Sequence, residues 1–309
     1  MVKRNANLRR SVRRLECLRD VVPFIFCMTF PCNVCLSGQN LSQSELIKKS
    51  RESCVRVLVQ LESRWLPAGT GFFIDPNRVV TCWHVIAGDP PIDPNTKGID
   101  YSKWRPYSDI AVITAAGDQI SAECTDTPTA TEPGPVRCDF AILKLKTKPT
   151  QGISCVPLSQ GTINPTEGDD VYFSGFPLGA PAMLTHKGML SGFTKGQTRL
   201  CIQAPVNKGN SGGALLNTQG EVIGIISYKE GGITKDLGRV RKAITALKEQ
   251  NVLSVTTEGE KIDLLTVEKD IIDVLDTYIS TGIGYARNIS CARDYVKKYS
   301  LMKSGSGSK

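Results

Sequence analysis

Three short segments of this sequence carry side chains of the types that acyl transfer needs. His84 lies in the run TCWHVI, where an apolar strand enters a loop, and Asp139 stands near the head of the apolar run CDFAILKL. Ser211 lies in KGNSGGAL, whose glycines let the backbone turn tightly and direct its N–H groups to one point. Acyl transfer at neutral pH requires a nucleophile, a base that takes its proton and a group that orients the base. A serine, a histidine and an aspartate can supply these three parts.

Each of these segments also has a purely structural interpretation. A Trp–His pair at a strand end can be packing, a carboxylate that heads a strand can be a cap, and NSGG can be a simple turn. Asp109 also heads an apolar run, DIAVI, and is the alternative acid. His186, the only other histidine, lies within a strand-like run, and we expect it to be structural or solvent-facing.

Short runs with strand character, separated by Gly, Pro, Asp and Asn, dominate the chain from about residue 54. This pattern predicts antiparallel barrels or a sandwich. Helical periodicity appears late, in 237–247 and 267–278, and a helical stretch at 290–299 precedes a Gly/Ser-rich tail. The strand-like runs are 54–61, 69–74, 78–86, 110–116, 138–145, 170–176, 183–193, 198–204 and 221–228.

The segments TxxHV, DFAILK and GNSGG, in this order, resemble those of the chymotrypsin-fold (trypsin-like) serine peptidases. They are most similar to the bacterial HtrA/Deg-type branch, in which GNSGG replaces GDSGG. Supporting matches are GTGF at 69–72, SGFPLG at 174–179 and GIGYA at 282–286. The resemblance spans roughly 54–299. It implies an all-β fold of two antiparallel six-stranded β-barrels, with a C-terminal helix and a helical insertion.

The resemblance also implies a role for each residue of the three segments. Ser211 is expected to attack the scissile carbonyl, His84 to act as base and then acid, and Asp139 to fix the imidazole tautomer. The backbone N–H groups of Gly209 and Ser211 are expected to form the oxyanion hole. Because Asn210 stands where zymogens carry an Asp, activation by a freed N-terminal amine is not expected.

The same resemblance divides the chain into domains, with the cleft between two barrels. The expected parts are a leader at 1–40, a first barrel at 41–148 with His84 and Asp139, a second barrel at 149–228 plus 281–300 with Ser211 and the C-terminal helix, an insertion at 229–280 and a tail at 301–309.

The specificity pocket is expected just before the candidate nucleophile and along the strand that follows it. No carboxylate lies in the expected pocket base, so a preference for Lys or Arg is disfavoured and a small or apolar side chain fits better. The residues that the resemblance assigns to this pocket are Pro205, Val206, Asn207, Ile226, Ser227 and Tyr228.

The insertion is the largest departure from the family. A basic amphipathic helix (239–248), a hairpin (252–265) and an acidic helix (268–276) are predicted within it. It is either a helical embellishment that buries surface, or a segment that gates the pocket or docks a regulator. The chain ends soon after Tyr299, so the peptide-binding PDZ domain of HtrA-type enzymes is not expected.

The composition is that of an ordinary globular chain of 309 residues, 40% hydrophobic and 22% charged. It excludes a polytopic membrane protein, a coiled coil, a collagen-like fibre and a wholly disordered chain. The net charge of +8 is concentrated in residues 1–20, which hold seven Lys/Arg and two Asp/Glu, whereas the remainder holds 31 and 28. Without a stripe of basic and aromatic residues, nucleic-acid binding is not expected.

The N-terminal segment has the layout of a secretory signal. Its basic part is followed by an apolar stretch at 21–38, which Pro23 and Pro31 interrupt, and by small residues. The alternatives are a retained membrane anchor at 21–38 and a true start near Met28. We therefore expect an exported protein, periplasmic or secreted, or one that associates with a membrane through this segment.

Cysteine spacing indicates neither a disulfide framework nor a metal site. Four of the eleven cysteines lie in the leader, and no CxxC pair occurs outside it. Most of the others lie in apolar runs, where a free cysteine behaves as a small buried hydrophobe, although their redox state stays open. No metal or cofactor is expected. The seven cysteines outside the leader are Cys54, Cys82, Cys124, Cys138, Cys155, Cys201 and Cys291.

The function predicted from these features is a serine-type endopeptidase acting on proteins or peptides. Two alternatives remain: a catalytically silent peptide-binding protein of the same fold, and a self-processing protease with one partner substrate.

Overall fold

The computed structural model describes most of the chain after the predicted leader. The leader, the tail and nearly all of the predicted basic helix lie outside the described residues. Within the described part, no helix is both long and apolar enough to cross a bilayer. The described residues are 40–89, 91, 93, 95–96, 100–126, 138–150, 153–160, 165–177, 180, 182–229, 240, 254–257, 260–278, 282–293 and 295–296.

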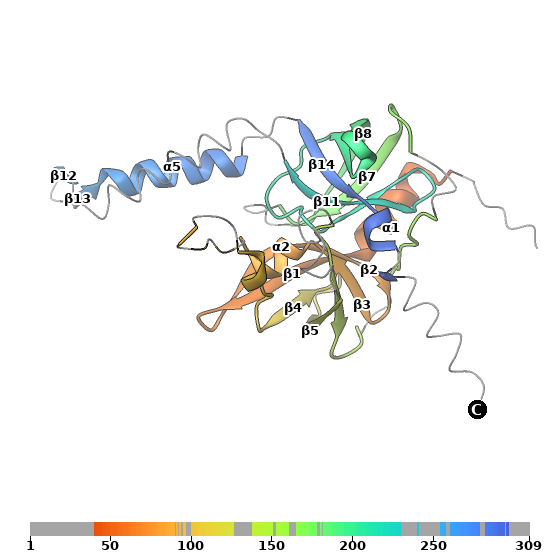
Figure 1. Ribbon diagram of the computed structural model, residues 1–309, viewed down its shortest axis with the longest axis horizontal. Helices are drawn as coiled ribbons and strands as arrows, with labels where there is room; N and C mark the ends of the chain where they lie inside the picture. Colours follow the sequence, from red (N-terminus) through yellow and green to blue (C-terminus); the bar gives the residue numbers. More distant parts are fainter. Residues whose placement is uncertain are drawn as a thin grey trace, which may run out of the picture. The chain divides into compact units, whose positions relative to one another are not determined.

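Six antiparallel strands close the first barrel in the order β1-β2-β3-β6-β5-β4 (Figure 1). Apolar side chains that alternate along these strands fill its interior, among them Val55, Val57, Phe72 and Val80, all fully buried. The strands are β1 (Cys54–Leu61), β2 (Arg64–Asp75), β3 (Arg78–Thr81), β4 (Ile110–Ile113), β5 (Gln119–Asp126) and β6 (Ala141–Leu145).

Six further strands close the second barrel in the order β10-β11-β14-β9-β8-β7. The last strand, β14, pairs with β11 on one side and β9 on the other, so the insertion interrupts the chain between two neighbouring strands. The predicted fold of two closed six-stranded barrels is confirmed. The strands are β7 (Asp170–Gly175), β8 (Leu184–Phe193), β9 (Arg199–Gln203), β10 (Ala214–Leu216), β11 (Val222–Lys229) and β14 (Ile283–Asn288).

A helix that the sequence analysis missed, α1 (Gln43–Ser53), precedes the first barrel. Ser42 and Glu45 form a capping box at its start, a signal that is visible in the sequence. Although α1 leads directly into β1, the hydroxyl of Ser50 donates to Ser174 Oγ in β7 at 2.8 Å. The helix therefore joins the start of the first barrel to the second barrel.

The predicted hairpin in the insertion is confirmed as β12 (Ser254–Thr257) paired with β13 (Glu260–Asp263). Helix α5 (Leu264–Tyr278) follows at once, in the region where the acidic helix is predicted. Asp263 caps this helix, because its Oδ1 accepts hydrogen bonds from the backbone N–H groups of Leu265 at 3.1 Å and Thr266 at 3.4 Å.

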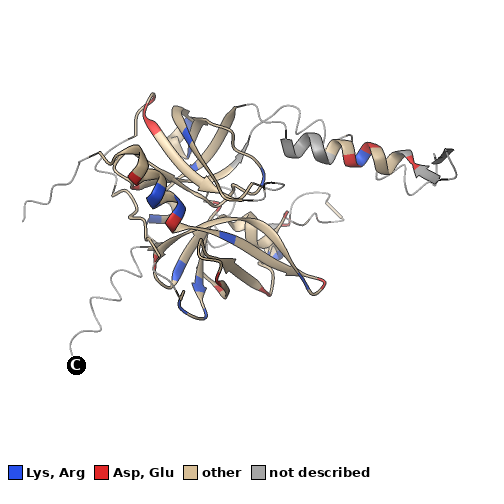
Figure 2. Cartoon of the chain, turned by 180° about the vertical axis from the view of Figure 1, so that it is seen from behind, with Lys and Arg blue, Asp and Glu red and all other residues tan. Residues whose placement is uncertain are grey.

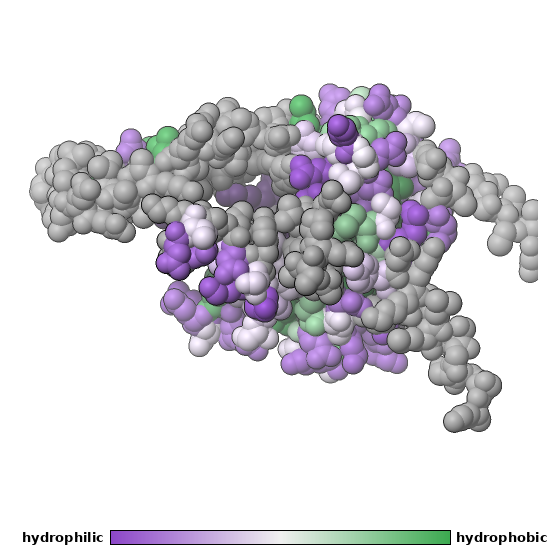
Figure 3. Space-filling model, viewed as in Figure 1, coloured by the Kyte–Doolittle hydropathy of each residue, from purple (hydrophilic) through white to green (hydrophobic). Residues whose placement is uncertain are grey.

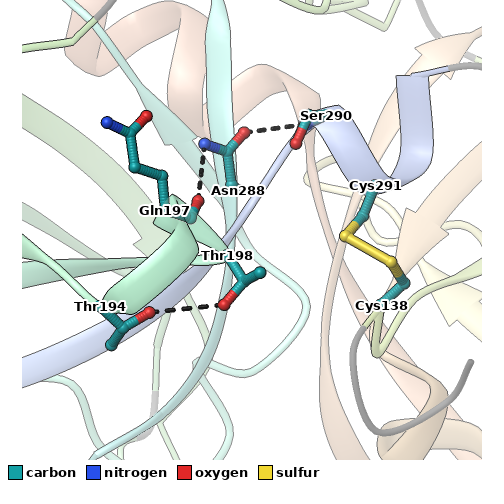
Figure 4. Close-up of a disulfide and its surroundings, with 7 residues drawn as sticks. All are labelled: Cys138, Thr194, Gln197, Thr198, Asn288, Ser290 and Cys291. Carbon is teal, nitrogen blue, oxygen red and sulfur yellow. Dashed lines mark hydrogen bonds between the residues drawn. A yellow bond between two sulfur atoms is a disulfide. The ribbon is translucent and has the colours of Figure 1, made fainter. Parts of the chain in front are cut away.

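A disulfide joins Cys138, just before β6, to Cys291 in the helical segment that follows β14. Figure 4 shows it near Ser290, whose N–H donates to Asn288 Oδ1 at 3.0 Å. The sequence left the redox state of these two residues open. Their separation of 153 residues explains why no local spacing indicated the bond. Cys54 and Cys82, in contrast, are buried free thiols.

Charges of both signs are distributed over the described strands and α1 (Figure 2). On the face shown in Figure 3, hydrophilic side chains predominate among the described residues, and hydrophobic ones form small separate groups. The concentrated positive charge of residues 1–20 lies outside the described part.

Candidate active site

The pairing of β3 with β6 brings His84 close to Asp139. Thr81, the last residue of β3, pairs with Ala141, the first residue of β6. The short helix α2 (Trp83–Ala87) begins two residues after Thr81 and carries His84 in its first turn. Asp139 lies two residues before Ala141, so both side chains emerge at the same end of this strand pair.

Asp139 accepts three hydrogen bonds. The His84 ring atom Nδ1 lies 2.7 Å from Oδ2, and the backbone N–H of His84 donates to Oδ1 at 3.1 Å. The hydroxyl of Ser227 donates to Oδ2 at 3.0 Å. Because Asp139 is only 6% exposed, these bonds replace the water that the carboxylate lacks.

These contacts shift the pKa of both partners. Burial raises the pKa of Asp139, but the charge of His84 and the hydrogen bonds from His84 and Ser227 outweigh it, so the pKa falls to about 2. Burial lowers the pKa of His84, but the charge and hydrogen bond of Asp139, with help from Asp89, outweigh it, so the pKa is raised. Asp139 is therefore ionised at neutral pH and stabilises the protonated imidazole.

Ser211 lies in the tight turn between β9 and β10. The N–H of Asn210 donates to Asn207 O at 3.0 Å, and the N–H of Gly213 donates to Asn210 O at 3.1 Å. Gly212 has φ +92°, and a Cβ there would overlap the carbonyl oxygen of Thr70, so only glycine fits. The turn thus depends on the glycines that follow Ser211.

The Ser211 hydroxyl donates to the carbonyl oxygen of Ser227 at 2.6 Å. In the described part of the chain, no hydrogen bond joins Ser211 to His84. Ser227 thus contacts two of the candidate residues: its hydroxyl donates to Asp139, and its carbonyl oxygen accepts from the Ser211 hydroxyl. From the sequence, Ser227 is expected only in the pocket wall, and no sequence pattern indicates its contacts with Asp139 and Ser211.

The backbone N–H groups of Gly209 and Ser211 are the expected oxyanion donors. No described residue accepts a hydrogen bond from either group. Gly209 has φ +92°, and its carbonyl oxygen accepts a 2.6 Å hydrogen bond from the hydroxyl of Thr70. Two N–H donors separated by one residue, beside a serine hydroxyl, are of the type that binds an oxyanion.

The family model of the trypsin-like peptidase domain matches residues 69–225, about half of the chain, and includes all three segments. The chain belongs to the trypsin-like peptidase family. The HtrA/Do-like resemblance is also confirmed, because the curated relatives include proteases of that type.

Two of these relatives match about half of this chain at similar levels of identity. Protease Do-like 2, chloroplastic, of Arabidopsis thaliana is 27% identical over 174 residues, which are 54% of this chain and 24% of that protein. The serine protease Do-like HtrA of Lactococcus lactis is 29% identical over 164 residues, which are 49% of this chain and 33% of that protein. The chain thus spans a quarter to a third of the length of these relatives.

A solved structure supports the fold of the peptidase. The crystal structure of the serine endoprotease from Yersinia pestis aligns with a TM-score of 0.51 at 19% identity. The alignment covers 84% of this chain and 67% of the other.

The residues expected at the specificity pocket differ in burial. Val206 and Ile226 belong to the buried core of the second barrel, and a Cβ at Gly284 in β14 would overlap Val206. Asn207 is half-buried, and its Oδ1 atom has no partner among the described residues, whereas Pro205 is exposed. The side chain of Tyr228 lies outside the described residues.

Among the described residues, Cys82, His84 and Asp139 of the peptidase bring three possible metal-ligand atoms within 4.8 Å of one another. Burial and the charge of Asp139 raise the pKa of the Cys82 thiol well above its usual value, so the thiol is protonated at neutral pH. The Cys82 thiol donates to Ile226 O at 3.2 Å, so a hydrogen bond already accounts for its placement.

Two other residues considered in the sequence lie away from these contacts. Asp109, the alternative acid, is exposed and accepts a hydrogen bond from the neighbouring Ser108 hydroxyl. His186 is half-buried and stacks on Phe173, and burial lowers the pKa of its imidazole. Of the two aspartates, only Asp139 contacts His84.

Proposed function

We propose that this chain is a serine endopeptidase that hydrolyses peptide bonds through an acyl-enzyme intermediate. The observation that carries the proposal is the convergence on Ser227, whose hydroxyl binds Asp139 and whose carbonyl accepts the hydroxyl of Ser211. The 2.7 Å contact between His84 and Asp139 completes the set of groups that acyl transfer needs.

In the proposed reaction, rotation of the Ser211 side chain moves its hydroxyl from Ser227 O to Nε2 of His84. Oγ then attacks the scissile carbonyl while His84 takes its proton. His84 returns that proton to the leaving amine, and an acyl ester on Ser211 remains. A water molecule, deprotonated by His84, hydrolyses the ester and releases the acid.

Asp139 and the oxyanion donors have separate roles in this mechanism. Asp139 stays ionised, as its pKa of about 2 requires, holds the Nδ1–H tautomer of His84 and stabilises the imidazolium. The N–H groups of Gly209 and Ser211 bind the negative oxygen of the tetrahedral intermediate. Each such donor contributes about 10²–10³ in rate.

The proposed specificity is for small or apolar side chains. The segment before Ser211 supplies Pro205, Val206 and Asn207, none of which is charged, and Val206 packs in the barrel core. A cationic Lys or Arg side chain would find no carboxylate there to offset the cost of losing water. Peptides that differ only at this side chain, compared by kcat/KM, test the preference.

A catalytically silent peptide-binding protein is the second candidate. The contact that favours it is the Ser211 hydroxyl, which is bonded to Ser227 rather than to His84. In a silent protein this arrangement persists when a peptide binds, whereas in an enzyme it is the resting state.

A fluorophosphonate probe separates the two candidates, because it reacts with an activated serine. We expect the wild-type chain to be labelled once, and Ser211→Ala to show no labelling while keeping the wild-type unfolding temperature. Absence of labelling in the folded wild type would reject the peptidase and support the silent protein.

We also propose that the protein is exported. The Cys138–Cys291 bond supports this, because stable disulfides belong mainly to oxidising compartments. N-terminal sequencing of the native protein distinguishes a cleaved leader from an anchor retained at 21–38.

A further inference from the structure

Thr70 lies in β2 of the first barrel, between two glycines, and is fully buried. We infer that it is a positioning residue, whose hydroxyl holds the oxyanion loop of the second barrel in its competent shape. This inference rests on the proposed peptidase function and adds a residue outside the catalytic set.

The Thr70 hydroxyl connects β2, the residue that follows β7 and the turn that carries Ser211. Thr70 Oγ1 donates to the carbonyl oxygen of Gly209 at 2.6 Å and accepts from the N–H of Phe176 at 3.0 Å. Phe176 directly follows β7, and Gly209 opens the turn that carries Ser211. The hydroxyl thus uses its donor and its acceptor capacity to tie the oxyanion loop to both barrels.

The backbone of Thr70 holds the other side of the same loop. Its N–H donates to the carbonyl oxygen of Ser211 at 2.8 Å. Its own carbonyl oxygen accepts a 2.6 Å hydrogen bond from the hydroxyl of Thr81. Thr70 therefore fixes the carbonyl groups of both residues, Gly209 and Ser211, whose N–H groups are the proposed oxyanion donors.

The loop has no comparable support from the side chain at its centre. Asn210 is fully buried, and neither atom of its carboxamide has a partner among the described residues. Gly209, with φ +92°, is free to rotate because it lacks a Cβ. The hydrogen bond from Thr70 therefore opposes rotation at the residue that supplies one of the two donors.

Loss of the hydroxyl leaves the Gly209 carbonyl and the Phe176 N–H without this partner. Rotation about ψ of Gly209 would let its carbonyl find another partner. The Gly209 N–H lies in the preceding peptide unit, and a compensating rotation about φ of Gly209 would turn this donor away from the oxyanion. Removal of one donor costs about 10²–10³ in rate, and partial misplacement costs less. We expect kcat to fall about 10- to 100-fold, with KM changed less than about twofold, because the donors act on the transition state.

Three substitutions test this role. Thr70→Val keeps the side-chain shape but removes the hydroxyl, Thr70→Ser keeps the hydroxyl, and Thr114→Val is the matched control. Thr114 is also buried, and its hydroxyl accepts a hydrogen bond from Asp118 N in the β4–β5 turn, outside the oxyanion loop. Kinetics with a peptide substrate give kcat and KM, and inhibition by a peptide aldehyde reports on binding of a tetrahedral oxyanion.

With Thr70→Val, kcat should fall and the aldehyde should bind more weakly by a similar factor. Thr70→Ser should stay within about threefold of wild type, and Thr114→Val should lose stability only. Unchanged kcat and aldehyde binding in Thr70→Val would overturn the inference, as would failure of Thr70→Ser to preserve activity.

If Thr70→Val does not fold, Thr70→Ala takes its place. If neither variant folds but Thr70→Ser does, the hydroxyl is needed for stability, and the inference is overturned. Fluorophosphonate labelling of the wild type is scored first, so a failure of the proposed peptidase function is distinguishable from a failure of the Thr70 inference.

Discussion

The hydroxyl of Ser227 donates a 3.0 Å hydrogen bond to Asp139, and the carbonyl oxygen of the same residue accepts the hydroxyl of Ser211. One residue of β11 therefore contacts both the acid that orients His84 and the proposed nucleophile. Since Ser227 belongs to the second barrel and Asp139 precedes a strand of the first, this bond also links the two barrels at the site.

Ser227→Ala tests the importance of this hydroxyl. The two hydrogen bonds from His84 to Asp139 remain, so we expect kcat/KM to fall about tenfold, in line with the loss of one hydrogen bond to a charged group. Ser53→Ala, which removes another buried hydroxyl from the end of α1, should leave kcat/KM unchanged. Equal kcat/KM in Ser227→Ala and wild type would contradict the prediction.

The pH dependence of kcat/KM should follow the ionisation of His84. The base must be neutral in the free enzyme, and the pKa of His84 is raised above the usual 6.5. Activity should therefore be lost as the pH falls from the alkaline side through a midpoint above 6.5. A midpoint below 6.5 in the wild type would contradict this assignment.

Asp139→Asn should move that midpoint downward. Without the charge of Asp139, burial dominates and lowers the pKa of His84. The loss of the correct tautomer should also reduce kcat by about 10⁴. Because the chain has only two histidines, NMR titration of the imidazole signals, assigned with a His186 variant, can follow His84 directly.

Loss of the Cys138–Cys291 disulfide should destabilise the fold. The bond closes a loop of 153 residues and joins the segment before β6 to the helix after β14. The ring contact of Phe140 with Tyr295, 5.2 Å between centroids, lies beside it and remains. We expect Cys138→Ser with Cys291→Ser to lower the free energy of unfolding by about 2–5 kcal/mol. A dithiol reductant should lower the unfolding temperature of the wild type but not that of the double variant. An equal change in the unfolding temperature of both proteins would argue against the disulfide.

The fold class and most of the barrel strands could be predicted because these strands are short, largely apolar and bounded by turn residues. The predicted runs did not include β5, in which buried and exposed residues alternate, or the three-residue strand β10. His84, Asp139 and Ser211 stood out because each lies in a segment with a chemical pattern. The contact of Ser227 with Asp139 could not be predicted, since it depends on how two barrels meet. The same holds for the disulfide, whose partners are far apart in sequence, whereas the Ser42–Glu45 capping box of α1 was a visible signal that was missed.

The insertion can be removed without breaking a strand of either barrel. It leaves β11 after Lys229 and returns at Ile283 in β14, and Lys229 pairs with Gly284 in this antiparallel ladder. A turn of about four residues can therefore replace residues 230–282. The variant should keep the unfolding cooperativity of the wild type, since both barrels remain closed.

Removing the insertion should change substrate binding. The residues just before it, Ser227 and Tyr228, belong to the predicted wall of the specificity pocket. We expect KM for peptides with small or apolar side chains to rise about tenfold with kcat little changed. This result is expected when the lost contacts bind the substrate and the transition state equally. A smaller deletion that removes only β12 and β13 serves as the control. If the full deletion folds and its KM, kcat and side-chain preference equal those of the wild type, the insertion only buries surface and takes no part in substrate selection.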